Sequence, residues 1–244
     1  MEIDQKTQAL QELFWDYENC ERCPLSSPEG CRRSNIVFGQ GDPDAKVMII
    51  GDYPRMDDEA EAEPFSSRSN SGILLDRILA SLGATRDQVW IDQMVMCVPH
   101  KNAHEERPPN KDEVAACKDR LYEVIKIVDP RIILLLGATA LRLAKKWADP
   151  WDKDVAPFRE GISSVATAPV KPRLVVEVPG VMGPIRYEAR ATFHPKFILR
   201  LTSQEFNRQG GPNDHMYQSW ENAFKYVQMG EYLYTGRVPY RDME

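Results

Sequence analysis

The sequence predicts an α/β layered domain built around a mainly parallel sheet. Short apolar runs alternate along the chain with segments of helical spacing, and the first of these runs, residues 46–51, ends at a glycine. Residues 131–137 (Arg-Ile-Ile-Leu-Leu-Leu-Gly) form an unbroken apolar run, which suits a parallel strand covered on both faces. In domains of this class, the ligand site lies where the carboxyl ends of the strands meet the loops.

The predicted elements follow one another in a regular order. Apolar runs predict strands at residues 46–51, 88–96, 131–137, 173–178 and 185–193. Helical spacing predicts helices at residues 72–83, after Asn110, and from Gly137 to about Lys146. Prolines, glycines and serines between residues 147 and 172 predict a surface loop. We expect one domain over residues 1–203 and a helical extension over residues 204–244, with an aromatic-rich helix at 216–229 that packs on the domain.

The helix after Asn110 has the clearest start signal in the chain. Asn110 and Glu113 have the spacing of a capping box, in which each side chain accepts a hydrogen bond from the other residue's backbone N–H. The helix that they begin places five residues on one face: Val114, Cys117, Leu121, Val124 and Ile125. Cys117 is therefore predicted to point into the protein.

The composition bounds the class of protein. The chain has 244 residues and 42% hydrophobic residues, enough to bury a core of its own. Its formal net charge of −6 argues against a general nucleic-acid coat protein, but it is compatible with an enzyme that contacts DNA through a local patch. No segment approaches the roughly 18 uninterrupted apolar residues of a membrane span, and residues 1–12 are polar. We expect a cytoplasmic monomer that does not enter the membrane.

Four of the five cysteines have the placement of metal ligands. Cys20 and Cys23 form a Cys-x-x-Cys pair, while Cys97 and Cys117 are separated by 19 intervening residues. A zinc ribbon repeats two short knuckles, whereas an iron–sulfur cluster needs only four sulfurs that converge in space. Without a secretion signal, metal binding is favoured over disulfides. Cys31 is interpreted as a bystander or, alternatively, as a replacement for one of the four ligands.

A series of short motifs resembles family 4 of the uracil-DNA glycosylase superfamily, its iron–sulfur branch. The motifs are Gly51-Asp52-Tyr53-Pro54-Arg55, Asp58-Glu59, Pro64-Phe65, Leu74-Leu75, Trp90-Ile91-Asp92-Gln93 leading to Cys97, Leu136-Gly137, and His194-Pro195-Lys196-Phe197-Ile198-Leu199-Arg200. They cover about residues 17–200, in the order and near the spacing of the family. Each motif is weak alone, and their common order carries the resemblance.

The resemblance implies a three-layer α/β/α sandwich with a central, mainly parallel sheet of four to five strands. It also implies a monofunctional enzyme that flips a pyrimidine out of DNA and hydrolyses its N-glycosidic bond, which leaves an abasic site. Breaking this bond develops positive charge on the sugar and negative charge on the base. Asp52 would act on the sugar side and His194 would donate a hydrogen bond to the base. Phe65 would stack on the base, with Tyr53 and Gln93 completing the pocket.

Further residues are implied as DNA contacts. They are Arg55, Ser66, Ser67, Arg68 and Ser69 after the first strand, and Lys196, Phe197, Ile198 and Arg200 after the His-Pro pair. Phe197 or Ile198 would fill the gap that the flipped base leaves. For the serines, a role in the turn is an equal alternative to phosphate binding. The four cysteines would hold a structural 4Fe-4S cluster, with a zinc ion in the same thiolates as the alternative.

The sequence departs from the family pattern at the implied site. Tyr53 stands where the family has alanine, Arg55 where it has glycine, and Gln93 where it has asparagine, and the loop after Phe65 is longer and more polar. These departures predict a modified pyrimidine, such as the bulky bases of bacteriophage DNA, as the target, with a role in phage biology or antiviral defence. The alternatives are ordinary excision of uracil in the repair of DNA damage, or an inactive relative that only binds DNA or a protein.

Overall fold

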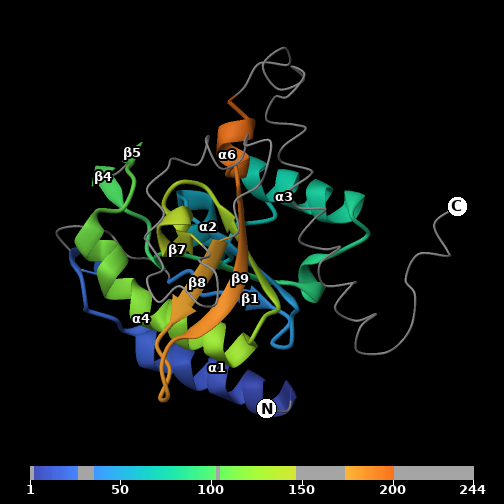
Figure 1. The fold of residues 1–244 in the computed structure, drawn as a ribbon. Helices are drawn as coiled ribbons and strands as arrows, with labels where there is room; N and C mark the ends of the chain where they lie inside the picture. Colours follow the sequence, from blue (N-terminus) through green and yellow to red (C-terminus); the bar gives the residue numbers. More distant parts are fainter. Residues whose placement is uncertain (1–2, 27–35, 103–104, 147–173, 201–244) are drawn as a thin grey trace, which may run out of the picture.

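The computed structural model describes residues 3–26, 36–102, 105–146 and 174–200, and all structural statements concern these ranges (Figure 1). The main sheet contains β1 (Gln40–Gly41), β2 (Val47–Gly51), β3 (Trp90–Gln93), β6 (Ile132–Leu136), β7 (Ala144–Lys146), β8 (Leu174–Val178) and β9 (Ile185–Thr192). A separate hairpin pairs β4 (His100–Asn102) with β5 (Glu105–Glu106). The helices are α1 (Ile3–Glu18), α2 (Met56–Glu61), α3 (Asn70–Ser81), α4 (Lys111–Val128) and α6 (Pro195–Ile198).

The strand order in the described sheet is β1-β3-β2-β6-β9-β8-β7. The four central strands, β3, β2, β6 and β9, are parallel, while β1, β8 and β7 pair antiparallel at the two sides. In the described ranges the sheet has seven strands, so the predicted number of four to five is wrong. The two additional strands, β1 and β7, contain only two and three residues, too few to give a periodic pattern.

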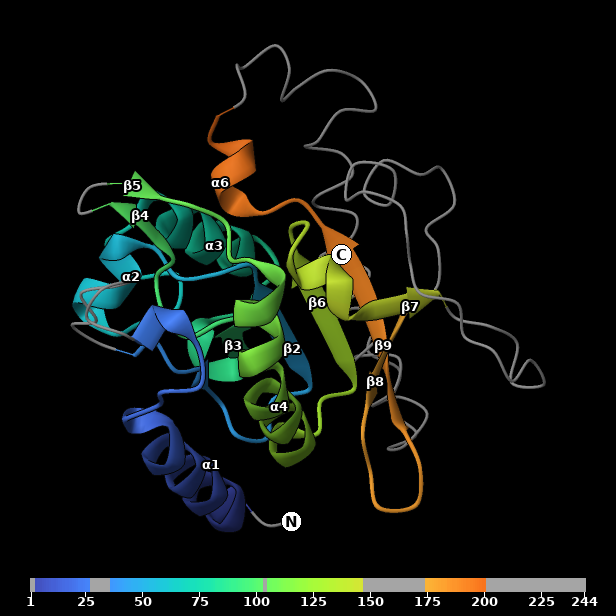
Figure 2. The ribbon, with the colours of Figure 1, turned by 90° about the vertical axis from the view of Figure 1, so that its left-hand side faces the viewer.

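Helices cover both faces of this sheet, so the predicted three-layer α/β/α sandwich is confirmed (Figure 2). Every residue of β2 and β6 is buried, and alternate side chains enter different cores. Met48 and Ile50 belong to the core beneath α1 and α4, whereas Val47 and Ile49 belong to the core beneath α3 and α6. The unbroken apolar runs therefore arise because each strand is covered twice.

Helix α4 begins as the sequence predicts. The side chain of Asn110 accepts a hydrogen bond from the Glu113 N–H at 2.9 Å, and the Glu113 carboxylate accepts one from the Asn110 N–H at 2.7 Å. The five residues assigned to the inner face, Cys117 among them, are all buried. This helix therefore fixes Cys117 inside the protein.

The helix predicted from Gly137 to Lys146 is wrong. Gly137 turns the chain at a φ of 99°, a single 3-10 turn follows at Ala140–Leu143, and the chain then enters β7. Strand β7 pairs with β8 in a register that aligns Ala144 with Val176. This tertiary pairing overrides the helical propensity of a short segment. Conversely, α1 was not predicted, because residues 1–12 are mostly polar and give no clear helical pattern. The buried apolar face of α1 includes Leu10 and Tyr17.

Several predictions fall on residues that the structure does not describe. They are the loop at residues 147–172, the domain boundary at residue 203, the helix at residues 216–229, and the place of Cys31. These stay predictions. In the described ranges, no helix has the length and apolar character of a membrane span.

Candidate active site

Four parallel strands deliver the candidate residues to one edge of the sheet. Asp52 directly follows β2, Gln93 is the last residue of β3, Gly137 directly follows β6, and His194 comes two residues after β9. The carboxyl ends of neighbouring parallel strands lie at the same edge, so residues far apart in sequence meet there. The structure thus brings together the loops that the sequence analysis singled out.

Asp52 is held by the turn that follows β6. Its Oδ1 accepts hydrogen bonds from the backbone N–H groups of Thr139 and Ala140, both at 2.8 Å. Burial raises the pKa of Asp52 to about 6, although these two hydrogen bonds act in the opposite direction. A Cβ atom on Gly137 would lie 2.5 Å from Oδ2 of Asp52, so only glycine allows this close approach. The result is a fixed, partly buried carboxylate that titrates near neutrality.

His194 is neutral and its tautomer is set by the backbone. Burial, together with the positive charges of Arg55 and Lys196, lowers its pKa to about 3. Its Nδ1 accepts a hydrogen bond from the Lys196 N–H at 3.1 Å, at the start of α6. Because Nδ1 is the acceptor of a neutral ring, the proton resides on Nε2. His194 therefore offers an N–H donor rather than a charged acid.

Phe65 forms an aromatic platform beside His194. The two rings stack with centroids 5.1 Å apart and an interplanar angle of 26°. The Phe65 ring also lies against Gly51, where an added Cβ would come within 2.6 Å of two ring atoms. Phe65 itself has a φ of 52°, an uncommon conformation for a residue other than glycine. The surrounding structure must hold it in this conformation.

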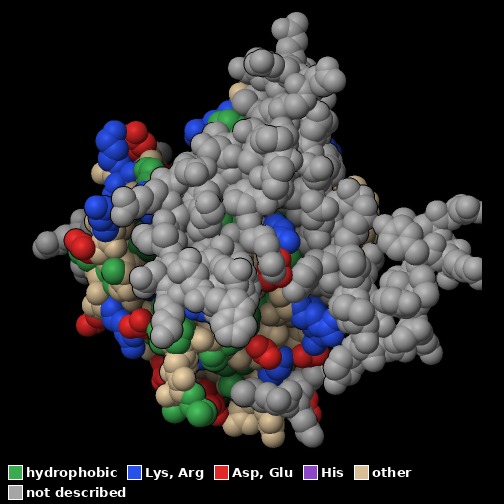
Figure 3. All heavy atoms as spheres, in the orientation of Figure 1, with side chains coloured by type: hydrophobic (Ala, Val, Ile, Leu, Met, Phe, Trp, Pro, Cys, Tyr) green, Lys and Arg blue, Asp and Glu red, His purple; other side chains and the backbone are tan. Residues whose placement is uncertain are grey.

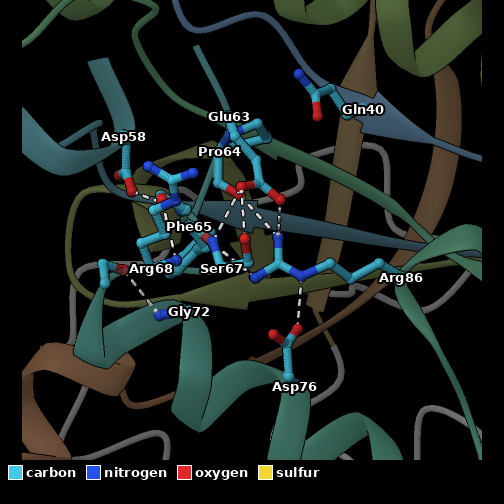
Figure 4. A network of polar contacts seen from close by, with 12 residues as sticks. Gln40, Asp58, Glu63, Pro64, Phe65, Ser67, Arg68, Gly72, Asp76 and Arg86 are labelled. Carbon is cyan, nitrogen blue, oxygen red and sulfur yellow. Dashed lines mark hydrogen bonds and ion pairs between the residues drawn. The ribbon is translucent and has the colours of Figure 1, made fainter. Parts of the chain in front are cut away.

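Arg86 supplies much of that support (Figure 4). Its Nη2 donates to the Phe65 carbonyl at 2.5 Å, and its Nη1 donates to the Pro64 carbonyl at 3.2 Å. Ion pairs to Asp76 at 2.5 Å and to Glu63 at 3.3 Å fix the guanidinium on both sides. Arg86 therefore ties the Phe65 turn to α3 and positions the aromatic ring.

Asp58 orients the amide of Gln93. The buried carboxylate of Asp58 accepts the N–H groups of Arg55 at 2.9 Å and Ser66 at 2.7 Å, and Nε2 of Gln93 at 3.3 Å. Burial raises the pKa of Asp58, and these hydrogen bonds oppose that rise. With Nε2 held toward Asp58, the buried Oε1 of Gln93 has no hydrogen-bond partner in the described ranges. Gln93 thus presents an acceptor that a ligand N–H could satisfy.

A buried ion pair fixes the backbone at Gln93. Nη1 of Arg120 lies 2.6 Å and 2.7 Å from the two carboxylate oxygens of Asp92, and both side chains are almost wholly inaccessible. Nη2 of Arg120 donates to the Gln93 carbonyl at 2.8 Å, while Asp92 accepts the Gln93 N–H at 2.7 Å. Arg120 lies one helical turn after Cys117 on α4, so the helix that carries this cysteine also positions Gln93.

Tyr53 and Arg55 form a second pair near the site. The guanidinium of Arg55 lies 4.0 Å from the centre of the Tyr53 ring, and its Nη1 donates to the Tyr53 hydroxyl at 2.8 Å. Tyr53 is buried, so these contacts fix its ring at the end of β2. The two departures from the family pattern in this loop are therefore in direct contact.

The serine loop is engaged in local structure. Oγ of Ser69 caps α3 by accepting the Gly72 N–H at 3.0 Å, and Oγ of Ser66 accepts the Arg68 N–H at 3.2 Å. Ser67 contacts Glu63, and the exposed Arg68 pairs with Glu61. These contacts fit the alternative that the serines shape the turn.

The segment after His194 divides into exposed and buried side chains. Phe197 is 43% exposed and stacks on Phe193 with centroids 5.0 Å apart, whereas Ile198 is buried in the core beneath α3. A side chain that enters a base stack must be accessible, so Phe197 remains the candidate. Lys196 is partly exposed and Arg200 is exposed.

The four cysteines gather on one side of the sheet without forming a recognisable metal site. Cys97 and Cys117 are buried in the core beneath α1 and α4, and Cys20 and Cys23 pack against it; none of the four is disulfide-bonded. Burial raises the pKa of the Cys117 thiol, and Cys23 and Cys20 are near enough to add to that rise. Within the described residues, no group of three or more metal-ligating side chains is placed to hold a metal ion. The purely thiol donor set fits an iron–sulfur cluster or zinc, so the metal site stays a prediction.

The sequence did not predict several residues that organise the site. Asp58 was noticed only as part of an acidic pair, and Arg86, Asp92, Arg120 and Glu106 were not singled out as organising residues. One signal was present for Arg120, because a charged residue beside the apolar face of a helix needs a buried partner. The others act through contacts between distant segments.

These observations define a class: an α/β sandwich whose strand ends carry a carboxylate, a neutral imidazole and an aromatic platform. A family model described as the uracil DNA glycosylase superfamily matches residues 38–222. The chain belongs to this superfamily, in its type-4 branch.

Curated relatives agree with this placement. The type-4 uracil-DNA glycosylase of Thermotoga maritima is 30% identical over 191 residues, which cover 78% of this chain and 83% of the relative. The type-4 enzyme of Pyrobaculum aerophilum is 38% identical over 128 residues, 52% of this chain and 60% of the relative. That of Sulfurisphaera tokodaii is 34% identical over 129 residues, 53% of this chain and 54% of the relative.

Proposed function

We propose that this protein is a monofunctional DNA glycosylase that flips a pyrimidine from DNA and hydrolyses its N-glycosidic bond. The observation that carries the proposal is that an ionisable carboxylate, Asp52, and a neutral N–H donor, His194, both lie at one edge of the sheet. The relatives' names make uracil the first substrate to test.

Each side chain has a task in this reaction. Ionised Asp52 orients the attacking water and stabilises the positive charge that develops on the sugar. The Nε2–H of His194 donates to a carbonyl oxygen of the base as negative charge builds on it. Phe65 supplies the stacking surface that the base loses when it leaves the helix, and Phe197 fills the gap. We assign the attack to water rather than to an amine, because the Asp52 carboxylate can orient and activate a water molecule.

The finer specificity that we propose is a modified pyrimidine in addition to plain uracil. The unpartnered Oε1 of Gln93 supports it, because an acceptor on an arm longer than asparagine would meet a base N–H at a shifted position. To test it, oligonucleotides with uracil and DNA with hydroxymethylated or glucosylated cytosine are incubated with the protein. Released bases are then identified by mass spectrometry. Rapid release of uracil alone would contradict the modified-base specificity.

The rate of base release should depend on the ionisation of Asp52. Because its pKa is raised to about 6, the carboxylate is charged above that pH and neutral below it. We expect the rate at saturating DNA to fall about tenfold per pH unit below about pH 6 and to be level from about pH 7 to 8.5. His194 stays neutral throughout, because its pKa is lowered to about 3. A rate that rises toward acid would contradict these roles.

We also propose that Cys20, Cys23, Cys97 and Cys117 hold a structural 4Fe-4S cluster. The position of all four in or against one core supports this proposal, although they are not arranged as a metal site. The anaerobically purified protein should absorb near about 400 nm and contain about four irons per chain. Cys117→Ser should remove this absorbance and lower the midpoint of urea unfolding. Cys31→Ser should change neither, and a colourless protein with one zinc would contradict the cluster.

A further inference from the structure

Glu106, at the end of the β4–β5 hairpin, bridges the two loops of the candidate site. Its Oε2 lies 2.8 Å from Nη1 of Arg55 and 3.1 Å from Nζ of Lys196, and its Oε1 accepts the Met56 N–H at 3.1 Å. Only 12% of its side chain is exposed. Figures 1 and 2 show the hairpin and α6 at the same end of the sheet. One carboxylate therefore receives three donors from two separate segments.

These donors flank the groups assigned to the reaction. Arg55 comes three residues after Asp52, and Lys196 comes two residues after His194. Arginine, lysine and backbone N–H groups are the donors that proteins use to hold DNA phosphates. A carboxylate and a phosphodiester both present two oxygens that share a negative charge. The site therefore has the donor chemistry of a phosphate subsite, with an acidic side chain in it.

The charge of the chain explains why a local phosphate subsite matters for DNA binding. On the described part of the face in Figure 3, Lys and Arg side chains lie among Asp and Glu side chains, and the whole chain has a net charge of −6. Such a protein has little general attraction for DNA, so a few local cations must supply the phosphate contacts. Burial raises the pKa of Glu106, but hydrogen bonds from Arg55, Met56 and Lys196 outweigh it and lower that pKa. Glu106 is thus ionised at neutral pH.

We propose that Arg55, the Met56 N–H and Lys196 form a subsite for a DNA phosphate next to the flipped nucleotide. Glu106 occupies this subsite in the free protein, and a phosphate replaces its carboxylate when DNA binds. The choice of DNA as the ligand rests on the proposed function. Glu106 then lowers the affinity for DNA in general, because every binding event must first displace it.

The test compares Glu106→Gln with Glu105→Gln, a matched control on the same strand. Glu105 is exposed and contacts only Lys101 and Asn102 among the described residues, so its substitution removes the same charge without releasing Arg55 or Lys196. Binding to an unmodified fluorescent duplex is measured by anisotropy at several salt concentrations. We expect Glu106→Gln to lower Kd by about three- to tenfold. The slope of log affinity against log salt concentration should become steeper by about one, the amount expected for one more phosphate contact. Glu105→Gln should change Kd less than about twofold.

A double-mutant cycle tests whether the gain in DNA affinity comes from the proposed phosphate subsite. In a Lys196→Met background, Glu106→Gln should tighten binding much less than in the wild type. Glu106→Asp, which keeps the charge but shortens the side chain, should also tighten binding and provides a second variant should the glutamine protein fail to fold. Equal affinity and equal salt dependence of a folded Glu106 variant and the wild type would overturn the proposal. Since binding is scored without base release, tighter binding by a protein that releases no base would contradict only the proposed function.

Discussion

Asp52→Asn is expected to lower the rate of base release by at least about a hundred- to a thousandfold, with little change in DNA affinity. The substitution keeps an oxygen that can accept the Thr139 and Ala140 N–H groups, so the turn after β6 should stay in place. It removes the negative charge that orients water and stabilises the sugar cation. Single-turnover release of uracil from a labelled oligonucleotide measures the effect. A variant within about tenfold of the wild type would remove Asp52 from the reaction.

The same variant offers a control for misfolding. The pKa of Asp52 is raised on folding, to about 6, so the folded state favours the protonated form. The stability that this protonation contributes is present at low pH and is lost as the pH rises through about 6. Asparagine cannot ionise, so Asp52→Asn should be at least as stable as the wild type above about pH 7. A variant that is inactive and also much less stable at that pH would point to a structural role instead.

Arg120→Met is expected to destabilise the protein by about 3–5 kcal/mol, the largest effect on stability that we predict. It leaves the carboxylate of Asp92 buried without its partner, and both side chains are almost wholly inaccessible. It also removes the hydrogen bond to the Gln93 carbonyl, so any remaining activity should discriminate less between bases. Urea unfolding at neutral pH measures the change in free energy.

A matched double variant separates two causes of the expected loss of stability: the unpaired buried charge and the change in side-chain volume. Asp92→Asn combined with Arg120→Met removes both charges and keeps side chains of similar size, so it should recover a large part of the lost stability. The double variant should not recover full base discrimination, because Gln93 still lacks the hydrogen bond from Arg120. If Arg120→Met alone were as stable as the wild type, the buried pair would not hold this part of the fold.

The parts of the fold that the sequence predicts are those with local signals. Strands β2 and β6 are continuous apolar runs, and α4 carries its capping box within four residues, so all three could be located from short windows. Strand β7 could not, because three residues become a strand only by pairing with β8, about thirty positions later in the chain. The two-residue β1 has the same dependence on its partner.

In the candidate site, too, the residues with local signals could be predicted and those that depend on distant contacts could not. Asp52, Gln93 and His194 could be predicted because each stands at the end of a recognisable strand, and parallel strands end together. The residues that orient Gln93 could not be predicted, since Asp58 reaches it across 35 positions and Arg120 across 27. Those contacts depend on how whole elements pack, which no local pattern encodes. Sequence thus locates the reactive groups more easily than it locates their supports.

The central claim is that this site excises a base from DNA. Its most direct test is the release of free base from a duplex that carries a single uracil, followed by mass spectrometry at about pH 7.5, where Asp52 is ionised and His194 is neutral. The proposed function predicts free uracil and an alkali-sensitive abasic site, both dependent on Asp52. Binding of the duplex without release of uracil, or of any modified pyrimidine put in its place, would contradict it.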